Sequence, residues 1–159
     1  MTRTLSGDAV TDLILEVFRL NGRLLAVGDR LVAGLGLTSA RWQIVGAIAL
    51  SDRPLPVAWL ARSMGLNRQG VQRIVNELHK DGFVEFKPNP NHRRAHFVVL
   101  TERGKSIYDE AERLQRPWVN TLAEGLSVKD IATATRVAAA LRERLEREPD
   151  NGTGEYDLK

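Results

Sequence analysis

The stretch LPVAWLARSMGLNRQGVQRIVNELHKDGF, Leu55 to Phe83, decides the fold of this chain. Its apolar residues recur at helical spacing in two short runs, and Gly65 stands between the runs, where a helix would end. Pro56 suits the first position of the first helix, and Asn67 suits the N-cap of the second. Two helices joined by so short a turn predict a helix-turn-helix.

The second of these predicted helices has one apolar face and one face of amide and guanidinium groups. Val71, Val75 and Leu78 recur on the apolar face. We predict that the opposite face, with the cap, contacts double-stranded DNA through Asn67, Arg68, Gln69, Gln72, Arg73 and Asn76. Arginine can donate a bidentate pair to guanine, and glutamine or asparagine can pair with adenine, so these residue types can read major-groove base edges. Protein-interaction modules also use this geometry, so the motif alone leaves that class open.

A predicted β-hairpin follows this recognition helix. The segments FVEFK, residues 83–87, and HFVVL, residues 96–100, are rich in β-branched and aromatic residues, and a loop rich in proline and asparagine joins them. A helix-turn-helix followed by a hairpin is a winged helix. The loop carries His92, Arg93 and Arg94, which we expect to follow the DNA backbone or to enter the minor groove, whose negative potential attracts arginine.

Charge is distributed unevenly along the chain. From Arg53 to Gly104, nine Lys and Arg residues stand against four Asp and Glu residues, a net charge of +5 in a chain whose net charge is +3. The rest of the chain is therefore weakly acidic. A basic middle third is the asymmetry that a polyanionic partner produces.

Long predicted helices flank the winged region. Apolar residues recur at helical spacing from Val10 to Leu35, and two further stripes lie between Ile107 and Leu145. These stripes leave more apolar surface than a small winged domain can cover, which predicts a homodimer. We expect a mainly α (α+β) chain with a helical dimerisation region at 1–36 and 102–148, a winged helix-turn-helix domain at 37–101 and a mobile tail at 149–159.

Several single residues mark the expected ends and irregularities of the helices. Thr38 suits the N-cap of a helix that follows the first long one, and the spacing of Ser127 and Asp130 is that of a capping-box variant opening the last helix. Pro117 is expected to kink the helix that contains it. Asn21 and Gly28 interrupt the first apolar stripe, which indicates a bend or a solvent-facing turn, or else close packing against a second copy or a polar contact beside a ligand.

Other classes of protein find little support in the sequence. The chain has no cysteine, and it lacks an apolar run long enough to span a bilayer, so we expect a cytoplasmic protein with no membrane partner. No Ser/His/Asp order, glycine-rich phosphate loop or close carboxylate pair is present, so neither an enzyme nor a cofactor is expected. A metal sensor built on His92 and His96 is a poorer account than a basic wing, because no cysteine and few acids accompany them.

Three segments together resemble the MarR family, the multiple-antibiotic-resistance type of winged-helix regulators. They are LTSARWQIVGAIA, VAWLARSMGLNRQGVQRIVNELHKDGFVEF and NHRRAHFVVLTERG, and the resemblance covers roughly Asp8 to Leu145. In that family the wing carries an Asp, one residue, then an Arg; here Arg94 matches the Arg, whereas His92 replaces the Asp. His92 either adds a pH-dependent donor to phosphate or is a tolerated loop substitution.

The resemblance implies a function as well as a fold. It implies a homodimeric, sequence-specific transcriptional regulator, usually a repressor, that binds an inverted-repeat operator and is released by a small-molecule effector. The effector, often aromatic or anionic, would occupy a cleft between the helical base and the winged domain, where Arg41 and Trp42 are candidate contributors. The alternative is an architectural or protein-interaction module that binds DNA without sequence preference.

Overall fold

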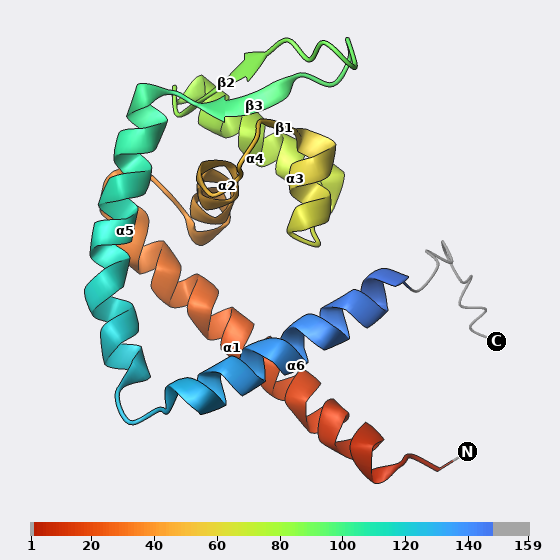
Figure 1. The fold of residues 1–159 in the computed structure, drawn as a ribbon. Coiled ribbons are helices and arrows are strands. Elements are labelled where there is room, and N and C mark those ends of the chain that lie inside the picture. Colours follow the sequence, from red (N-terminus) through yellow and green to blue (C-terminus); the bar gives the residue numbers. More distant parts are fainter. Residues whose placement is uncertain (1, 148–159) are drawn as a thin grey trace, which may run out of the picture. The chain divides into compact units, whose positions relative to one another are not determined.

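The computed structural model of the protein describes residues 2–147, so the predicted tail at 149–159 lies outside the described residues. The helices and strands, labelled in Figure 1, are in chain order α1 Leu5–Val32, η1 Ala33–Leu35, α2 Ser39–Ala49, β1 Leu55–Pro56, α3 Val57–Ser63, α4 Arg68–Lys80, β2 Val84–Lys87, β3 Phe97–Leu100, α5 Glu102–Ala123 and α6 Val128–Arg147. The chain divides at Pro117, inside α5, into two compact units.

The long first helix is confirmed, with a start earlier than the apolar stripe. Thr4 caps α1 by accepting a hydrogen bond from the amide of Gly7 at 3.0 Å. The helix tightens into η1, and Gly36 then ends it with a φ of 70°, in the left-handed region that favours glycine. Thr38 caps α2 as predicted, accepting a hydrogen bond from the amide of Arg41 at 3.3 Å.

Gly28 marks the place where α2 meets α1. Ser39, at the start of α2, is buried there, and its hydroxyl donates to the carbonyl of Leu25 at 2.8 Å. The Ser39 amide also donates to the Asp29 carboxylate at 2.6 Å. A Cβ atom on Gly28 would overlap the Ser39 hydroxyl. The expected solvent-facing turn is therefore wrong at this position, because Gly28 is buried and allows α1 and α2 of the same chain to approach closely.

The helix-turn-helix is confirmed with one correction at its start. Gly65 has a φ of 63° and follows the end of α3, as predicted. Pro56 is the N-cap of α3 rather than its first residue, and with Leu55 it forms the short strand β1. β1 pairs antiparallel with β3, which places Leu55 opposite Val98. The sequence did not reveal this strand, because two residues carry no periodicity and their partner lies far along the chain.

The predicted hairpin is confirmed and forms most of a small antiparallel sheet with the strand order β1-β3-β2. β2 and β3 pair from Val84 opposite Leu100 to Lys87 opposite Phe97. The sheet packs against α2 and α4, and the loop between β2 and β3 extends beyond them (Figure 1). This arrangement leaves the loop free to reach a partner.

One apolar core supports the winged region. α2, α3, α4 and the sheet supply most of its fully buried large side chains, which are Ile44, Val45, Leu60, Val71, Val75, Leu78, Val84 and Val98. Val32 of α1 and Ala111 of α5 are also fully buried in this cluster. The apolar core therefore extends beyond the predicted boundaries at 36 and 102, because one side chain from each flanking helix is buried in the core of the winged region.

The last helix begins as predicted and buries nothing within the described chain. The Ser127 hydroxyl accepts from the Asp130 amide at 3.0 Å and donates to the Asp130 carboxylate at 2.6 Å. No described residue of α6 is buried, and Leu145 is 67% exposed. No single described helix has the length and apolarity to cross a membrane; α1 with η1, taken together with α2, passes that test of length and composition only as a pair bent by 77°.

Candidate nucleic-acid interface

α4 has the architecture predicted for a recognition helix. Asn67 caps it, because its side-chain oxygen accepts from the amides of Gln69 at 2.8 Å and Gly70 at 3.2 Å. Val71 and Val75 are buried on its inner face. The six predicted contact residues are accordingly solvent-accessible: Asn67, Arg68, Gln69, Arg73 and Asn76 are exposed and Gln72 is half-buried.

Local contacts along α4 orient part of this polar face. The Gln72 side-chain amide donates to Asn76 at 2.9 Å, whereas Arg73 stands 3.9 Å from the Glu77 carboxylate across one helical turn. Glu77 and Lys80 share this surface with the predicted residues, although neither was included in the prediction. Their spacing from Arg73 and Asn76 was the available signal, because residues four apart lie on one helix face.

The wing loop is organised by Asn89. Its side-chain amide donates to the carbonyl of Ala95 at 3.0 Å, and its side-chain oxygen accepts from the Asn91 amide at 3.0 Å. The predicted wing residues His92, Arg93 and Arg94 follow and are exposed. The prediction omitted Asn89, although an asparagine in a turn-rich loop is itself a signal of such local bonding.

The wing and the recognition helix meet at a depression of about 230 Å³. Arg68 and Gln72 of α4 and Arg94 of the wing line it, so the structure brings together three of the predicted residues. His96 and the segment 56–58 also line this depression and were not predicted as contacts. Neither His92 nor Arg93 lines it.

Three guanidinium groups at this surface have no carboxylate partner among the described residues and can bind an anion. Among residues 2–147, Arg68, Arg93 and Arg94 make no ion pair with a carboxylate. Two cationic side chains from different elements, Arg68 and Arg94, therefore share one depression without a neutralising partner. Phosphate oxygens accept hydrogen bonds from such groups.

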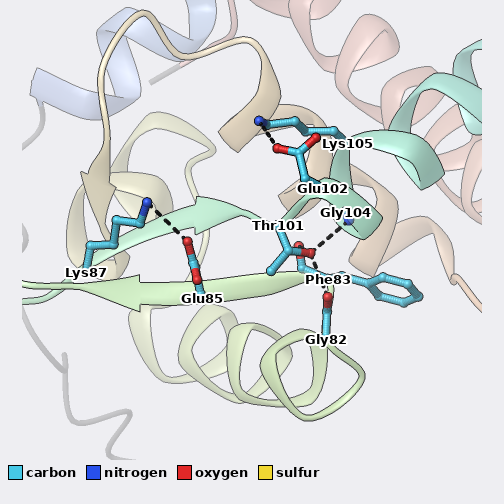
Figure 2. Close-up of polar contacts among 8 residues, drawn as sticks. All are labelled: Gly82, Phe83, Glu85, Lys87, Thr101, Glu102, Gly104 and Lys105. Atoms are coloured by element: carbon cyan, nitrogen blue, oxygen red, sulfur yellow. Dashed lines mark hydrogen bonds and ion pairs between the residues drawn. The ribbon is translucent and has the colours of Figure 1, made fainter.

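The start of α5 holds the C-terminal end of the recognition helix (Figure 2). The Thr101 hydroxyl donates to the carbonyl of Gly82 at 2.7 Å and accepts from the amide of Gly104 at 3.0 Å. The Thr101 amide donates to the carbonyl of Phe83 at 3.1 Å. Gly104 lies so close to this segment that a Cβ atom would overlap the Phe83 carbonyl. Within the sequence LTERG, Leu100 to Gly104, these contacts give Thr101 and Gly104 a physical role.

Arg41 of α2 also contacts the residues that follow α4, Asp81 and Phe83. Its guanidinium forms an ion pair with Asp81, which follows α4, and donates to the carbonyl of Gly36 at 3.0 Å. It also lies 5.8 Å from the centre of the Phe83 ring, a cation–π distance. Arg41 was a candidate for the effector cleft; its polar contacts instead connect the end of α1 and η1 to the end of the recognition helix.

Comparison with known proteins agrees with this architecture. A protein-family model described as the MarR family matches residues 35–95. An uncharacterised protein of Mycobacterium tuberculosis is 42% identical over 101 residues, which are 64% of this chain and 69% of that protein.

Solved structures show the same fold. A mutant MarR of Escherichia coli complexed with operator DNA is similar with a TM-score of 0.73 and 20% identity, covering 87% of this chain and 99% of that one. CouR of Rhodococcus jostii bound to p-coumaroyl-CoA is similar with a TM-score of 0.66 and 21% identity, covering 91% and 94%. With a winged helix that exposes Arg68 on its recognition helix and Arg94 on its wing, neither in an ion pair within residues 2–147, the chain belongs to the MarR family of DNA-binding transcriptional regulators.

Proposed function

We propose that this protein is a homodimeric, cytoplasmic repressor that binds an inverted-repeat operator and leaves it when a small molecule binds. The observation that carries the proposal is the pairing of the α4 polar face with the wing. Arg68, Gln72 and Arg94 surround one depression, and the two arginines have no carboxylate partner among the described residues.

The two elements have different roles in this proposal. The α4 residues Gln69, Gln72 and Arg73 read base edges, because amide and guanidinium groups match the donors and acceptors of the major groove. The wing residues His92, Arg93 and Arg94 bind phosphate or enter the minor groove, where positive charge adds affinity with little base selection.

Apolar surface on the flanking helices supports the homodimer. α1 exposes large hydrophobic side chains along its length, including Phe18 at 69%, and α6 exposes Ile131 at 42% and Leu145 at 67%. Large apolar side chains exposed in this number are unfavourable in water, and a second copy of the chain would cover them. We assign dimerisation to residues 1–36 and 102–148 and DNA binding to 37–101. A two-fold axis would present the recognition helices to half-sites about 34–36 Å apart.

A cleft of about 400 Å³ between α2, α3 and α5 is the effector site of this proposal. Trp42, Met64 and Tyr108 line it, so an aromatic molecule fits the chemistry of its walls. α2 also packs against α4. A ligand that moves α2 relative to α5 would therefore change the position of the recognition helix and release the operator.

The first experiment measures fluorescence anisotropy on the DNA upstream of the protein's own coding region, against a scrambled duplex, across a salt series. We expect tight binding by two subunits to the upstream DNA at salt concentrations that abolish scrambled binding. Equal affinity and equal salt dependence for both duplexes would instead favour the architectural module without sequence preference.

Two variants separate the roles of the helix and the wing. Arg73→Ala should reduce discrimination between the two duplexes by about 1–3 kcal/mol, whereas Arg94→Ala should weaken binding to both by similar factors. The reverse pattern would exchange the two assignments. A reporter gene behind the upstream DNA then distinguishes repression from activation.

A further inference from the structure

The cleft between α2, α3 and α5 that we propose as the effector site has a distinctive charge as well as aromatic walls. Its aromatic and polar lining is Trp42, Gln43, Tyr108, Glu112 and Gln115, and the other lining residues are glycine or apolar. Glu112 is the only one of these side chains that is charged at neutral pH, and it is half-buried. The cleft therefore offers a carboxylate and two amide side chains, but no cation.

Neighbouring cations do not neutralise this carboxylate. Among the described residues Glu112 makes no ion pair. Arg113, the next residue, instead binds Glu110, and Arg41 binds Asp81. Arg116, one helical turn further along α5, is exposed and does not line the cleft.

The Tyr108 hydroxyl reports the same negative surroundings. Burial is the largest effect that raises the pKa of Tyr108, and the charges of Glu112 and then Asp109 raise it further. Glu112 thus acts on a group in the cleft wall, whereas Asp109 lines a second depression beside Tyr108. A ligand carboxylate at this position would experience the same repulsion, whereas a ligand ammonium would be attracted.

We propose that this cleft selects small aromatic cations, such as aryl-alkyl amines, over aromatic carboxylates of the same size. The ring would lie against Trp42 and Tyr108, and the ammonium would reach Glu112. Aromatic faces also attract a cation directly, which adds to the carboxylate's effect. The selection of the ligand does not depend on the proposed function. Only the expected consequence of binding, release of the operator, rests on the proposed effector role.

A matched pair of probes tests the selection. Tryptamine and indole-3-acetate share an indole ring and differ in the sign of their charge at neutral pH. Isothermal titration with the full-length protein should give tryptamine a Kd lower by roughly tenfold. Equal affinities, a preference for indole-3-acetate, or no measurable binding of tryptamine would overturn the proposal.

Variants identify the group responsible. Glu112→Gln should remove the preference, while Glu110→Gln should keep it, because Glu110 carries the same charge on the same helix but pairs with Arg113 outside the cleft. A preference that survives in Glu112→Gln would overturn the assignment. Gly46→Leu provides an independent check: the glycine lines the cleft, and a Cβ there would stand 3.8 Å from the Tyr108 ring, so a larger side chain should block both probes.

The anisotropy assay with operator DNA separates this inference from the proposed function. Selective tryptamine binding without DNA release would sustain the ligand selection and reject this cleft as the effector site. DNA release by indole-3-acetate and not by tryptamine would reject the selection and leave the effector mechanism standing.

Discussion

α4 and α6 are both amphipathic helices, yet among the described residues only α4 has buried side chains. α4 buries Val71, Val75 and Leu78, whereas no described residue of α6 is buried. The apolar stripe of α4 faces α2 and α3, which pack against it. An apolar stripe therefore predicts that a helix will be covered, but it does not say whether the cover comes from the same chain.

The polar contacts of α4 and α6 also differ in how far along the sequence their partners lie. α4 is held at its C-terminal end by Arg41 and Thr101, which come from distant parts of the sequence. The polar contacts of α6 are local, such as the ion pair of Arg142 with Glu146 at 2.8 Å. Changes near α4 should therefore alter the fold, and changes on the α6 stripe should alter assembly.

Gly104→Ala should have the largest effect on the fold. The new methyl group would overlap the Phe83 carbonyl, which belongs to the backbone and cannot turn away as a side chain can. We expect a loss of about 3 kcal/mol or more in the free energy of unfolding, measured by urea denaturation. Gly22→Ala is the control, because a Cβ at Gly22 meets no atom within 4 Å. Similar stability of the two variants would contradict the close contact.

Leu145→Asp should affect assembly more than the fold. The side chain is 67% exposed, so its replacement removes little packing within the described residues. If the α6 stripe forms the dimer interface, the loss of buried leucine from both copies should weaken dimerisation by about 2 kcal/mol or more. Sedimentation velocity over a concentration series measures this loss. Arg136→Asp is the control: it reverses a charge on the face of α6 opposite the stripe, so this variant should remain dimeric. Equal dimerisation of both variants would show that α6 is not in the interface.

Thr101→Ala should have a moderate effect on the fold. It removes the hydroxyl that joins the Gly82 carbonyl to the Gly104 amide. We expect a loss of about 1–2 kcal/mol in the free energy of unfolding. Thr101→Ser retains the hydroxyl and should recover most of this stability. A serine variant as unstable as the alanine variant would show that the methyl group matters more than the hydrogen bonds.

Glu102→Gln should have the smallest effect, although the Glu102–Lys105 pair lies beside Thr101 (Figure 2). Both side chains are exposed, so solvent screens their attraction. Hydrogen bonding and then charge from Lys105 lower the pKa of Glu102. Any stabilisation by Glu102 is thus present above the carboxyl pKa of the unfolded chain and is lost as the pH falls through the lowered pKa. Urea denaturation at neutral pH should not distinguish the variant from the wild type; a clear loss would show that the pair is shielded from solvent.

Much of the winged region followed from local sequence signals. The Asn67 cap, the buried positions of α4, the glycine after α3 and the hairpin are all confirmed, because caps, periodicity and turn residues act over a few positions. Pro56 was placed one position wrong, and β1 was missed, because pairing with β3 decides both. Arg41 was only a candidate for the ligand cleft, because local signals do not show its ion-pair partner, Asp81, which follows α4.

The sequence by itself determined the helix-turn-helix, the wing and the family, since each depends on residues close together in the chain. Only the tertiary structure decided that Ser39 packs closely against Gly28 and that the Phe83 carbonyl packs closely against Gly104. It also decided that Arg68 and Arg94 line the same depression. Periodicity gives the face on which a side chain lies. The residue opposite that face depends on how distant segments pack, and close packing leaves space for a methyl group at one glycine and none at another.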